Sequence, residues 1–210
     1  MKKITALEVQ KRNPQRVNVY LDDQFAFGLA NIVAAWLKVG QEISDGKIAA
    51  LQEEDAREVA MQQALVFLGY RPRSSSEVRK NLQKHKFSES VIENVLERLQ
   101  HNGLVNDTDF ARAWVENRNT FRPRSRRALQ FELRQKGMPE ELIHDVLEEN
   151  VDEGQLAQQA AQKYAQKLQN LEWLEFRTKL GGFLGRRGFS YEVIVQVVRQ
   201  VWEETHPTST

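Results

Sequence analysis

The stretch LQKHKFSESVIENVLERL (82–99) recurs in outline as LRQKGMPEELIHDVLEEN (133–150) and as LGRRGFSYEVIVQVVRQV (184–201). Successive copies start 51 residues apart. Five columns are apolar in all three copies: Leu82/Leu133/Leu184, Phe87/Met138/Phe189, Val91/Leu142/Val193, Ile92/Ile143/Ile194 and Val95/Val146/Val197. A fixed period of this kind is typical of tandem repeat proteins. It predicts three consecutive repeats over residues 53–205.

The apolar spacing predicts three helices in each repeat. Val91, Ile92 and Val95 follow the interval of one helix face, and a shorter helix precedes them. Two apolar residues anchor this shorter helix in each repeat: Val78 and Leu82, Leu129 and Leu133, and Leu180 and Leu184. A longer first helix is expected around residues 59–68, 110–115 and 161–168. Pro72 and Pro123 separate the first helix from the second, because proline disfavours helix at the residue before it.

The turn after the second helix is expected to need a left-handed residue. Gly137 and Gly188 occupy the same column there and suit that conformation. The first repeat has Lys86 instead, so its turn should be strained or changed. Ser88 and Ser190 are expected to cap the third helix of their repeats.

The first 52 residues follow a different pattern. Residues 17–21 alternate between apolar and polar, Asp22 and Asp23 can form a turn, and Phe25 and Phe27 are expected on one face of a returning strand. Short helices are expected at 32–37 and 47–51. The predicted fold is mainly α, with three tandem three-helix repeats in an elongated curved array after a small N-terminal hairpin segment. The predicted limits are 1–52, 53–103, 104–154, 155–205 and a tail at 206–210.

Charge alternates between helices although the net charge is only +1. The motif RPRS occurs at 71–74 and 122–125, and the segments 71–86 and 122–137 each hold six basic residues and one acidic residue. The third helices of the first two repeats are acidic. Helical geometry turns the middle-helix cations away from the apolar anchors. The expected partner-binding basic stripe consists of Arg71, Arg73, Lys80, Lys84, Arg122, Arg124, Arg127, Arg134, Arg186 and Arg187.

Two explanations of this pattern compete. The middle helices can form salt bridges with their acidic neighbours, or the stripe can bind an anionic partner. In RPRS, chain geometry accounts for proline as a helix stop and serine as a cap, whereas it does not account for two arginines twice. The third repeat has Trp173–Phe176 in place of RPRS, so a shared role of the motif ends after two repeats.

Several functional classes lack their sequence signature. The chain has no cysteine, which excludes disulfides and Cys-ligated metals and suits a reducing cytosol. The start of the chain has no apolar signal core, and no run is long enough for a membrane helix. The histidines lack metal-ligand spacing, and no phosphate-binding loop or carboxylate pair is present. We therefore expect a cytoplasmic protein with no catalytic site, no metal and no cofactor.

Three glycines interrupt the second helix of the third repeat. Gly181, Gly182 and Gly185 each cost a helix about 1 kcal/mol relative to alanine. We expect them to allow close packing between helices. The alternative is that they allow the backbone of a partner to approach.

Four stretches resemble the RecX family of regulatory proteins: RVNVYLDDQFAFGL (16–29), ALVFLGYRPRSSSEVRKNL (64–82), GLVNDTDFARAWVENR (103–118) and ELRQKGM (132–138). The resemblance implies tandem three-helix repeats and a role in homologous recombination, DNA repair and the SOS response. It further implies binding to the RecA recombinase and its filament, with inhibition of its ATPase, strand-exchange and coprotease activities. It implies no catalytic residues.

Three functional hypotheses follow. A monomer could bind the recombinase filament through the basic stripe. The same cations could instead bind single- or double-stranded DNA without regard to sequence, since no base-reading helix is evident. A structural scaffold would need neither activity.

Overall fold

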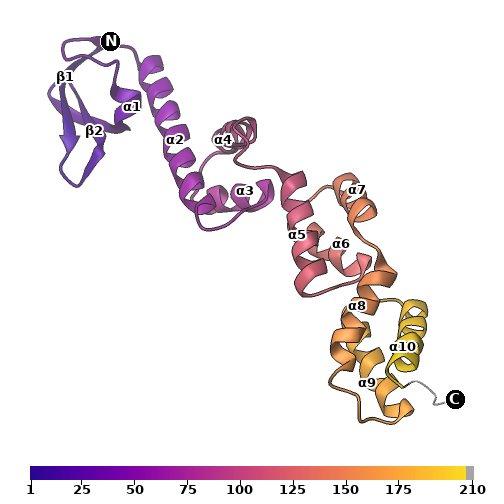
Figure 1. Cartoon of the computed structure of the whole chain (residues 1–210). Coiled ribbons are helices and arrows are strands. Elements are labelled where there is room, and N and C mark those ends of the chain that lie inside the picture. Colours follow the sequence, from indigo (N-terminus) through magenta and orange to yellow (C-terminus); the bar gives the residue numbers. More distant parts are fainter. Residues whose placement is uncertain (207–210) are drawn as a thin grey trace. The chain divides into compact units, whose positions relative to one another are not determined.

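The computed structural model describes residues 1–206 and divides into two compact units, residues 1–105 and the part that begins at Asn106. The first unit holds a small sheet and the first repeat, and the second unit holds the other two repeats (Figure 1). The prediction of a mainly helical fold with three three-helix repeats is confirmed. Of the predicted tail, 207–210 lie outside the described residues.

The N-terminal segment is a four-stranded sheet with the order β3-β2-β1-β4. The predicted hairpin corresponds to β2 and β3. The other two strands were not predicted, because only Ile4 of β1 is buried and the strand shows no clear alternation. The strands are β1 (Lys2–Gln10), β2 (Asn13–Leu21), β3 (Gln24–Ala30) and β4 (Glu42–Ile43).

The hairpin turn consists of Asp22 and Asp23, as the sequence predicts. Their φ angles are 49° and 63°, so both residues are left-handed, as a two-residue type I′ turn requires. The prediction that Phe25 and Phe27 share a face is wrong. Val19 pairs with Phe27 and Tyr20 pairs with Phe25, so a bulge lies between them. Phe27 enters the core, whereas Phe25 is exposed beside Tyr20.

A single long helix joins the sheet to the first repeat. The helix predicted at 47–51 and the first helix of the repeat are one element, α2 (Asp45–Leu68), with Gly46 in its first turn. Its N-terminal half packs Leu51 on the sheet, and its C-terminal half packs Ala64 into the repeat core. Figure 1 shows α2 running from the sheet to α3 and α4. Ser44 caps the helix by accepting from the Lys47 N–H.

Asp55 of α2 fixes the sheet to this helix. Its carboxylate accepts from the Ala30 N–H at 2.6 Å and pairs with Arg16 at 2.8 Å. The hairpin therefore packs against the first repeat through α2. The other short helix is shorter than predicted: α1 (Asn31–Ala34) ends before Leu37, which still reaches the sheet core.

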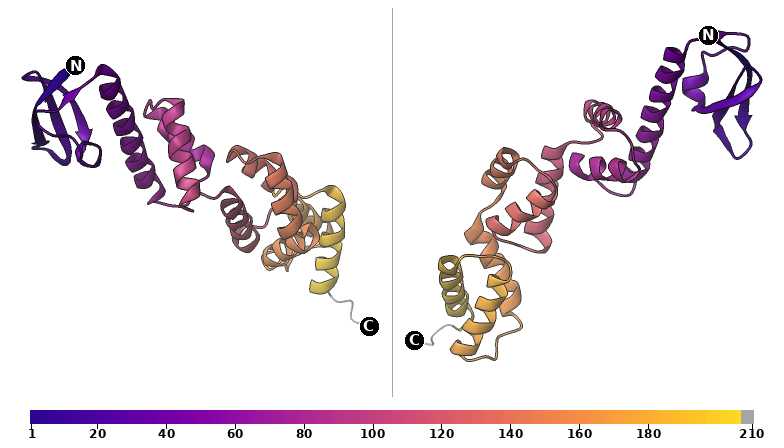
Figure 2. Two further views of the ribbon diagram at one scale, coloured as in Figure 1. Left: turned by 90° about the horizontal axis from the view of Figure 1, so that it is seen from above. Right: turned by 180° about the vertical axis from the view of Figure 1, so that it is seen from behind.

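The repeats contain the predicted helices. In the first and third repeats the second and third helices pack against the first, and Figure 2 shows α9 and α10 beside α8. In the second repeat the third helix packs against both the first and the second. The two anchor residues of every second helix are fully buried. The helices that follow α2 are α3 (Ser75–Lys84), α4 (Glu89–His101), α5 (Asp107–Phe121), α6 (Arg126–Gln135), α7 (Glu140–Asn150), α8 (Glu153–Ala165), α9 (Trp173–Gly185) and α10 (Tyr191–Thr205).

The turn after the second helix is left-handed in all three repeats. Lys86, Gly137 and Gly188 have φ angles of 64°, 78° and 89°. The first repeat therefore keeps the turn and places a lysine in a strained conformation. Ser190 caps α10 as predicted, by accepting from the Val193 N–H. Ser88 does not cap α4, because no side-chain cap bond forms there and its hydroxyl contacts that of Ser90 instead.

The glycines of α9 do not serve close packing, so that prediction is wrong. A Cβ atom on Gly181 would lie 3.6 Å from the Ile194 side chain, and one on Gly185 would lie 3.9 Å from it. On Gly182 it would lie 3.4 Å from the Arg186 guanidinium. These are ordinary contacts, so alanine would fit at each position.

Within residues 1–206 no helix is long and apolar enough to cross a membrane.

Candidate partner-binding surface

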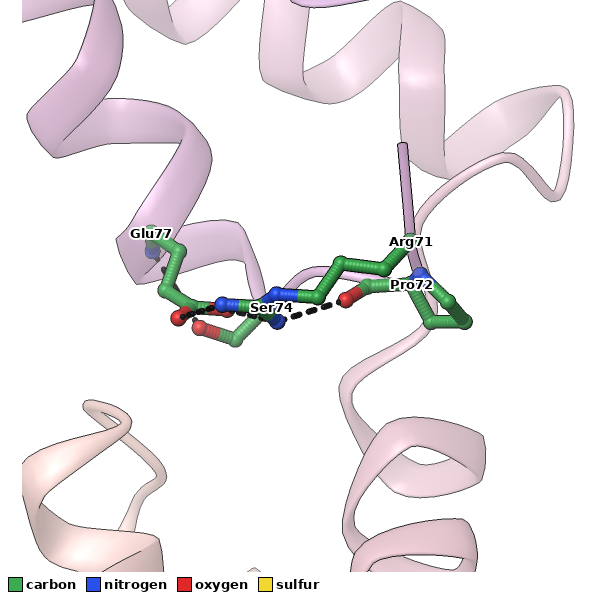
Figure 3. A network of polar contacts seen from close by, with 4 residues as sticks. All are labelled: Arg71, Pro72, Ser74 and Glu77. Atoms are coloured by element: carbon green, nitrogen blue, oxygen red, sulfur yellow. Dashed lines mark hydrogen bonds and ion pairs between the residues drawn. The ribbon is translucent and has the colours of Figure 1, made fainter. Parts of the chain in front are cut away.

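The first RPRS motif folds into a helix cap that neutralises Arg71. Figure 3 shows Arg71, Pro72, Ser74 and Glu77 in one network. The Arg71 guanidinium donates to both Glu77 carboxylate oxygens, at 2.9 and 3.3 Å, and to the Pro72 carbonyl oxygen at 2.9 Å. The Ser74 hydroxyl accepts from the Glu77 N–H, and the Glu77 carboxylate accepts from the Ser74 N–H, forming a capping box.

Arg73 of the same motif is held against α2. Its guanidinium carbon lies 4.1 Å from the centre of the Phe67 ring, a cation–π contact. Its Nε atom is buried and has no hydrogen-bond partner among the described residues. The side chain is half-buried, so the first motif offers a partner less free charge than its sequence suggests.

The second RPRS motif uses a different arginine for the internal pair. Arg124 pairs with Glu132 at 3.0 Å, and Arg118 pairs with the same carboxylate at 2.8 Å. The Trp114 indole N–H also donates to it at 2.8 Å. Glu132 is only 13% exposed, so one largely buried carboxylate holds two guanidinium groups. Arg122 is exposed and makes no ion pair with any residue in 1–206.

The second motif is also the contact point for the third repeat. Ser125 is buried and caps α6 by accepting from the Ala128 N–H. Its own N–H donates to the Arg187 carbonyl oxygen at 3.1 Å. A Cβ atom on Gly188 would lie 2.6 Å from the Ser125 hydroxyl oxygen, so the turn of the third repeat packs directly on this cap.

This contact gathers Arg122, Arg124, Arg186 and Arg187, which we call the junction cluster. The Arg187 guanidinium carbon lies 3.8 Å from the centre of the Phe183 ring, and its Nε atom is buried without a hydrogen-bond partner among the described residues. Burial lowers the pKa of Arg187, and the three neighbouring arginines lower it further. Arg124 is paired with Glu132, whereas Arg122, Arg186 and Arg187 form no ion pair among residues 1–206, so the cluster carries excess positive charge.

The middle-helix cations divide into paired and unpaired groups. Arg134 pairs with Glu140, and this hydrogen-bonded contact raises the pKa of Arg134 and lowers that of Glu140. Lys80, Lys84 and Arg127 are exposed and form no ion pair within the described part of the chain. Salt bridging thus accounts for Arg71, Arg124 and Arg134, whereas the other stripe residues form no ion pair within residues 1–206.

Sequence reasoning missed the residues that decide this division. Trp114, Arg118 and Glu132 form one network with Arg124, and none of the three was predicted to contribute. A spacing signal was present, because Trp114 and Arg118 lie four residues apart on one face of α5. Glu132 lies on a different helix, α6, and the folding of the repeat brings it to Trp114 and Arg118.

Comparisons with known proteins give a consistent result over most of the chain. Family models match residues 2–44 (regulatory protein RecX N-terminal domain) and 60–99, 106–147 and 152–198 (RecX first, second and third three-helix domains). The regulatory protein RecX of Bacillus pumilus (strain SAFR-032) is 33% identical over 95% of this chain and 78% of its own length. That of Bacillus subtilis (strain 168) is 34% identical over 94% and 76%.

A solved structure supports the same assignment. A crystal structure of regulatory protein RecX matches with a TM-score of 0.72 and 28% identity, over 94% of this chain and 98% of that chain.

Proposed function

This chain belongs to the RecX family of regulatory proteins, and we propose that it binds the RecA recombinase and its DNA filament and inhibits the ATPase, strand-exchange and coprotease activities. The family name indicates regulation of the recombinase. The binding surface is the basic stripe, and regulation requires no catalytic residue of this chain.

The observation that carries the proposal is the junction cluster. The cluster brings together four arginines from two repeats. Arg124 is paired with Glu132, and the other three form no ion pair among residues 1–206. Like charges that are partly desolvated repel one another, and a bound anion would relieve this repulsion. Guanidinium groups match carboxylate and phosphate oxygens in pairs. The cluster therefore suits a partner that presents carboxylates or phosphates, as a nucleoprotein filament does.

The unpaired lysines and arginines of the middle helices extend this chemistry. Lys80 and Lys84 lie on the exposed face of α3, and Arg127 lies on that of α6. Exposed cations contribute to the rate of association and its salt dependence more than to stability. We propose that they guide the protein to an acidic surface, on which the junction cluster then binds.

The test is co-sedimentation with recombinase–DNA filaments, together with the filament ATPase rate. Arg122→Glu with Arg186→Glu should weaken both binding and inhibition by at least about tenfold. Lys163→Glu with Lys167→Glu is the matched control: it changes the net charge equally, on exposed residues outside the stripe. Equal inhibition by the folded stripe variant and the control would contradict the proposal.

The alternative is that the cluster binds DNA phosphates without the recombinase. Paired guanidinium groups on one surface favour phosphate contacts and give no base readout. Salt titration on bare single-stranded DNA tests this, because affinity should fall with a log–log slope of about −0.7 per phosphate contact. No binding to bare DNA at low salt would exclude the alternative. A scaffold protein would respond to the charge reversals in neither assay.

A further inference from the structure

The groove between the second and third helices of each repeat is bridged by polar side chains in the first two repeats. In the first repeat, Arg79 of α3 pairs with Glu89 and, at 2.8 Å, with Glu93 of α4. In the second repeat, Gln130 of α6 occupies the column of Arg79 and donates to Glu140 of α7 at 3.4 Å. Both bridges cross the same groove from the same column of the repeat.

The third repeat has lost this bridge. The columns of Arg79, Glu89 and Glu93 hold Gly181, Tyr191 and Val195. Tyr191 and Val195 are 75% and 46% exposed, so exposed apolar side chains stand where the first two repeats have carboxylates or other polar side chains. A groove of about 400 Å³ lies between α9 and α10, lined by Trp173, Arg177, Gly181, Tyr191, Ile194, Val195, Val198 and Arg199.

The glycine that opens this groove is not required by helix packing. Because a Cβ atom on Gly181 would make only an ordinary contact with Ile194, alanine would fit and would favour the helix. Glycine keeps the floor of the groove low where a second backbone could approach. The exposed aromatic residues on the walls are an independent feature, and they indicate an apolar occupant.

The charge at the rim of the groove is reversed in the third repeat. The column that holds Glu97 and Glu148 in the first two repeats holds Arg199 in the third. The equivalent groove of the second repeat is lined by Glu140, Glu141 and Asp145, with Arg126 in the column of Arg177, whereas no acidic residue lines the groove of the third. Arg199 pairs with Glu203 at 3.0 Å, and Arg177 forms no ion pair among residues 1–206. The rim therefore favours an acidic occupant.

We propose that the α9–α10 groove is a docking site for an acidic peptide segment of a partner protein, with one apolar residue as its anchor. The anchor lies on Gly181 and Val198, between the Trp173 and Tyr191 rings. The peptide has a carboxylate on either side of the anchor. One contacts Arg177, and the other contacts Arg199 in place of Glu203. This site lies outside the basic stripe, and its occupancy does not depend on the proposed function of the stripe.

The probe is a short fluorescent synthetic peptide in which glutamates flank a single phenylalanine, measured by fluorescence anisotropy. We expect saturable binding to the full chain. Binding should fall at least about tenfold when the phenylalanine is replaced by serine or the glutamates by lysine. Equal binding of the three peptides would overturn the proposal, as would displacement of the acidic peptide by a single-stranded oligonucleotide, which would mark a nucleic-acid site.

Two variants locate the site. Gly181→Arg with Val195→Glu restores the bridge of the first repeat and should abolish peptide binding. Arg177→Glu changes only an exposed rim residue, so the variant should fold normally and should bind the acidic peptide at least about tenfold more weakly. Arg122→Glu with Arg186→Glu should leave peptide binding unchanged, which separates this site from the stripe. Wild-type affinity in a folded Arg177→Glu variant would refute the docking site.

Discussion

The two RPRS motifs are identical in sequence and differ in which arginine is neutralised. In the first, Glu77 pairs with Arg71, the leading arginine. In the second, Glu132 pairs with Arg124, the second arginine, and Arg122 is left without an ion pair in the described chain. The cause is the position of one glutamate. The column of Glu77 holds Ala128 in the second repeat, and that of Glu132 holds Asn81 in the first.

This comparison separates the structural part of the motif from its functional part. Proline and serine act alike in both copies, because Ser74 and Ser125 are fully buried and both cap the helix that follows. The arginines are governed by glutamates six and eight positions further along the chain. A repeated motif therefore specifies a backbone junction, and its free charge depends on residues elsewhere in the repeat.

The largest expected effect comes from breaking the contact of the second motif with the third repeat. Gly188→Ala places a methyl group against the Ser125 hydroxyl and in a left-handed backbone conformation. We expect a loss of about 2–4 kcal/mol in the free energy of unfolding, from overpacking and backbone strain together. Chemical denaturation measures it.

Gly103→Ala is the matched control for that substitution. Gly103 also has a positive φ, and no atom lies within 4 Å of the place that an alanine methyl group would take. It should lose only about 1–2 kcal/mol, the cost of strain alone. Equal losses in the two variants would show that the Ser125 contact contributes nothing.

The two glutamates should differ in their contribution to stability. Glu132→Gln leaves Arg118 and Arg124 without a counter-charge in a largely buried network, and we expect a loss of about 2–3 kcal/mol. Glu77→Gln weakens a capping box and an ion pair with the more exposed Arg71, with an expected loss of about 1 kcal/mol. Thermal unfolding of both variants measures the difference. A larger loss for Glu77→Gln would contradict the conclusion that Glu132 contributes more to stability than Glu77 does.

Sequence periodicity was sufficient to predict the repeats, but it could not predict which of their charged residues form ion pairs. The anchors of the second helices and the left-handed turns follow from local spacing, and each is found as predicted. The joined helix α2 was missed because the change of pattern near residue 52 suggested a boundary, and its start was placed after Gly46. The Ser44 cap and packing at both ends of the helix outweigh the local cost of that glycine.

The candidate site could be predicted as a set of cations and not as an arrangement. The pairing of Arg124 depends on Glu132. The position of Arg187 beside the second motif depends on how the second and third repeats pack against each other. Such contacts have no signal within a single helix. The third-repeat groove was equally hidden, because its glycines were assigned to packing between helices.

A single substitution should give the leading arginine of the second motif the ion pair that it has in the first. Ala128→Glu places a carboxylate in the column of Glu77, where it can pair with Arg122 and complete a capping box with Ser125. We expect stability to rise by about 0.5–1 kcal/mol. Filament binding should weaken about threefold to tenfold, because one free cation of the junction cluster is lost.

Ala128→Gln is the control for that variant. It can support the cap without neutralising Arg122, so filament binding should stay at the wild-type level in co-sedimentation. If glutamate and glutamine weaken binding equally, Arg122 has no electrostatic role in the contact.

The smallest expected effect concerns the turn that distinguishes the first repeat from the other two. Lys86 has a left-handed φ of 64°, where Gly137 and Gly188 stand in the other repeats. Glycine would remove about 1–2 kcal/mol of backbone strain and would add conformational entropy to the unfolded chain, which costs about 0.4–1 kcal/mol. Lys86→Gly should therefore raise the free energy of unfolding by about 0.5–1 kcal/mol, as measured by chemical denaturation. Lys86→Ala keeps the strain and removes the charge, so it should leave stability nearly unchanged. A gain from alanine equal to that from glycine would mean that charge, and not the backbone, sets the cost of this turn.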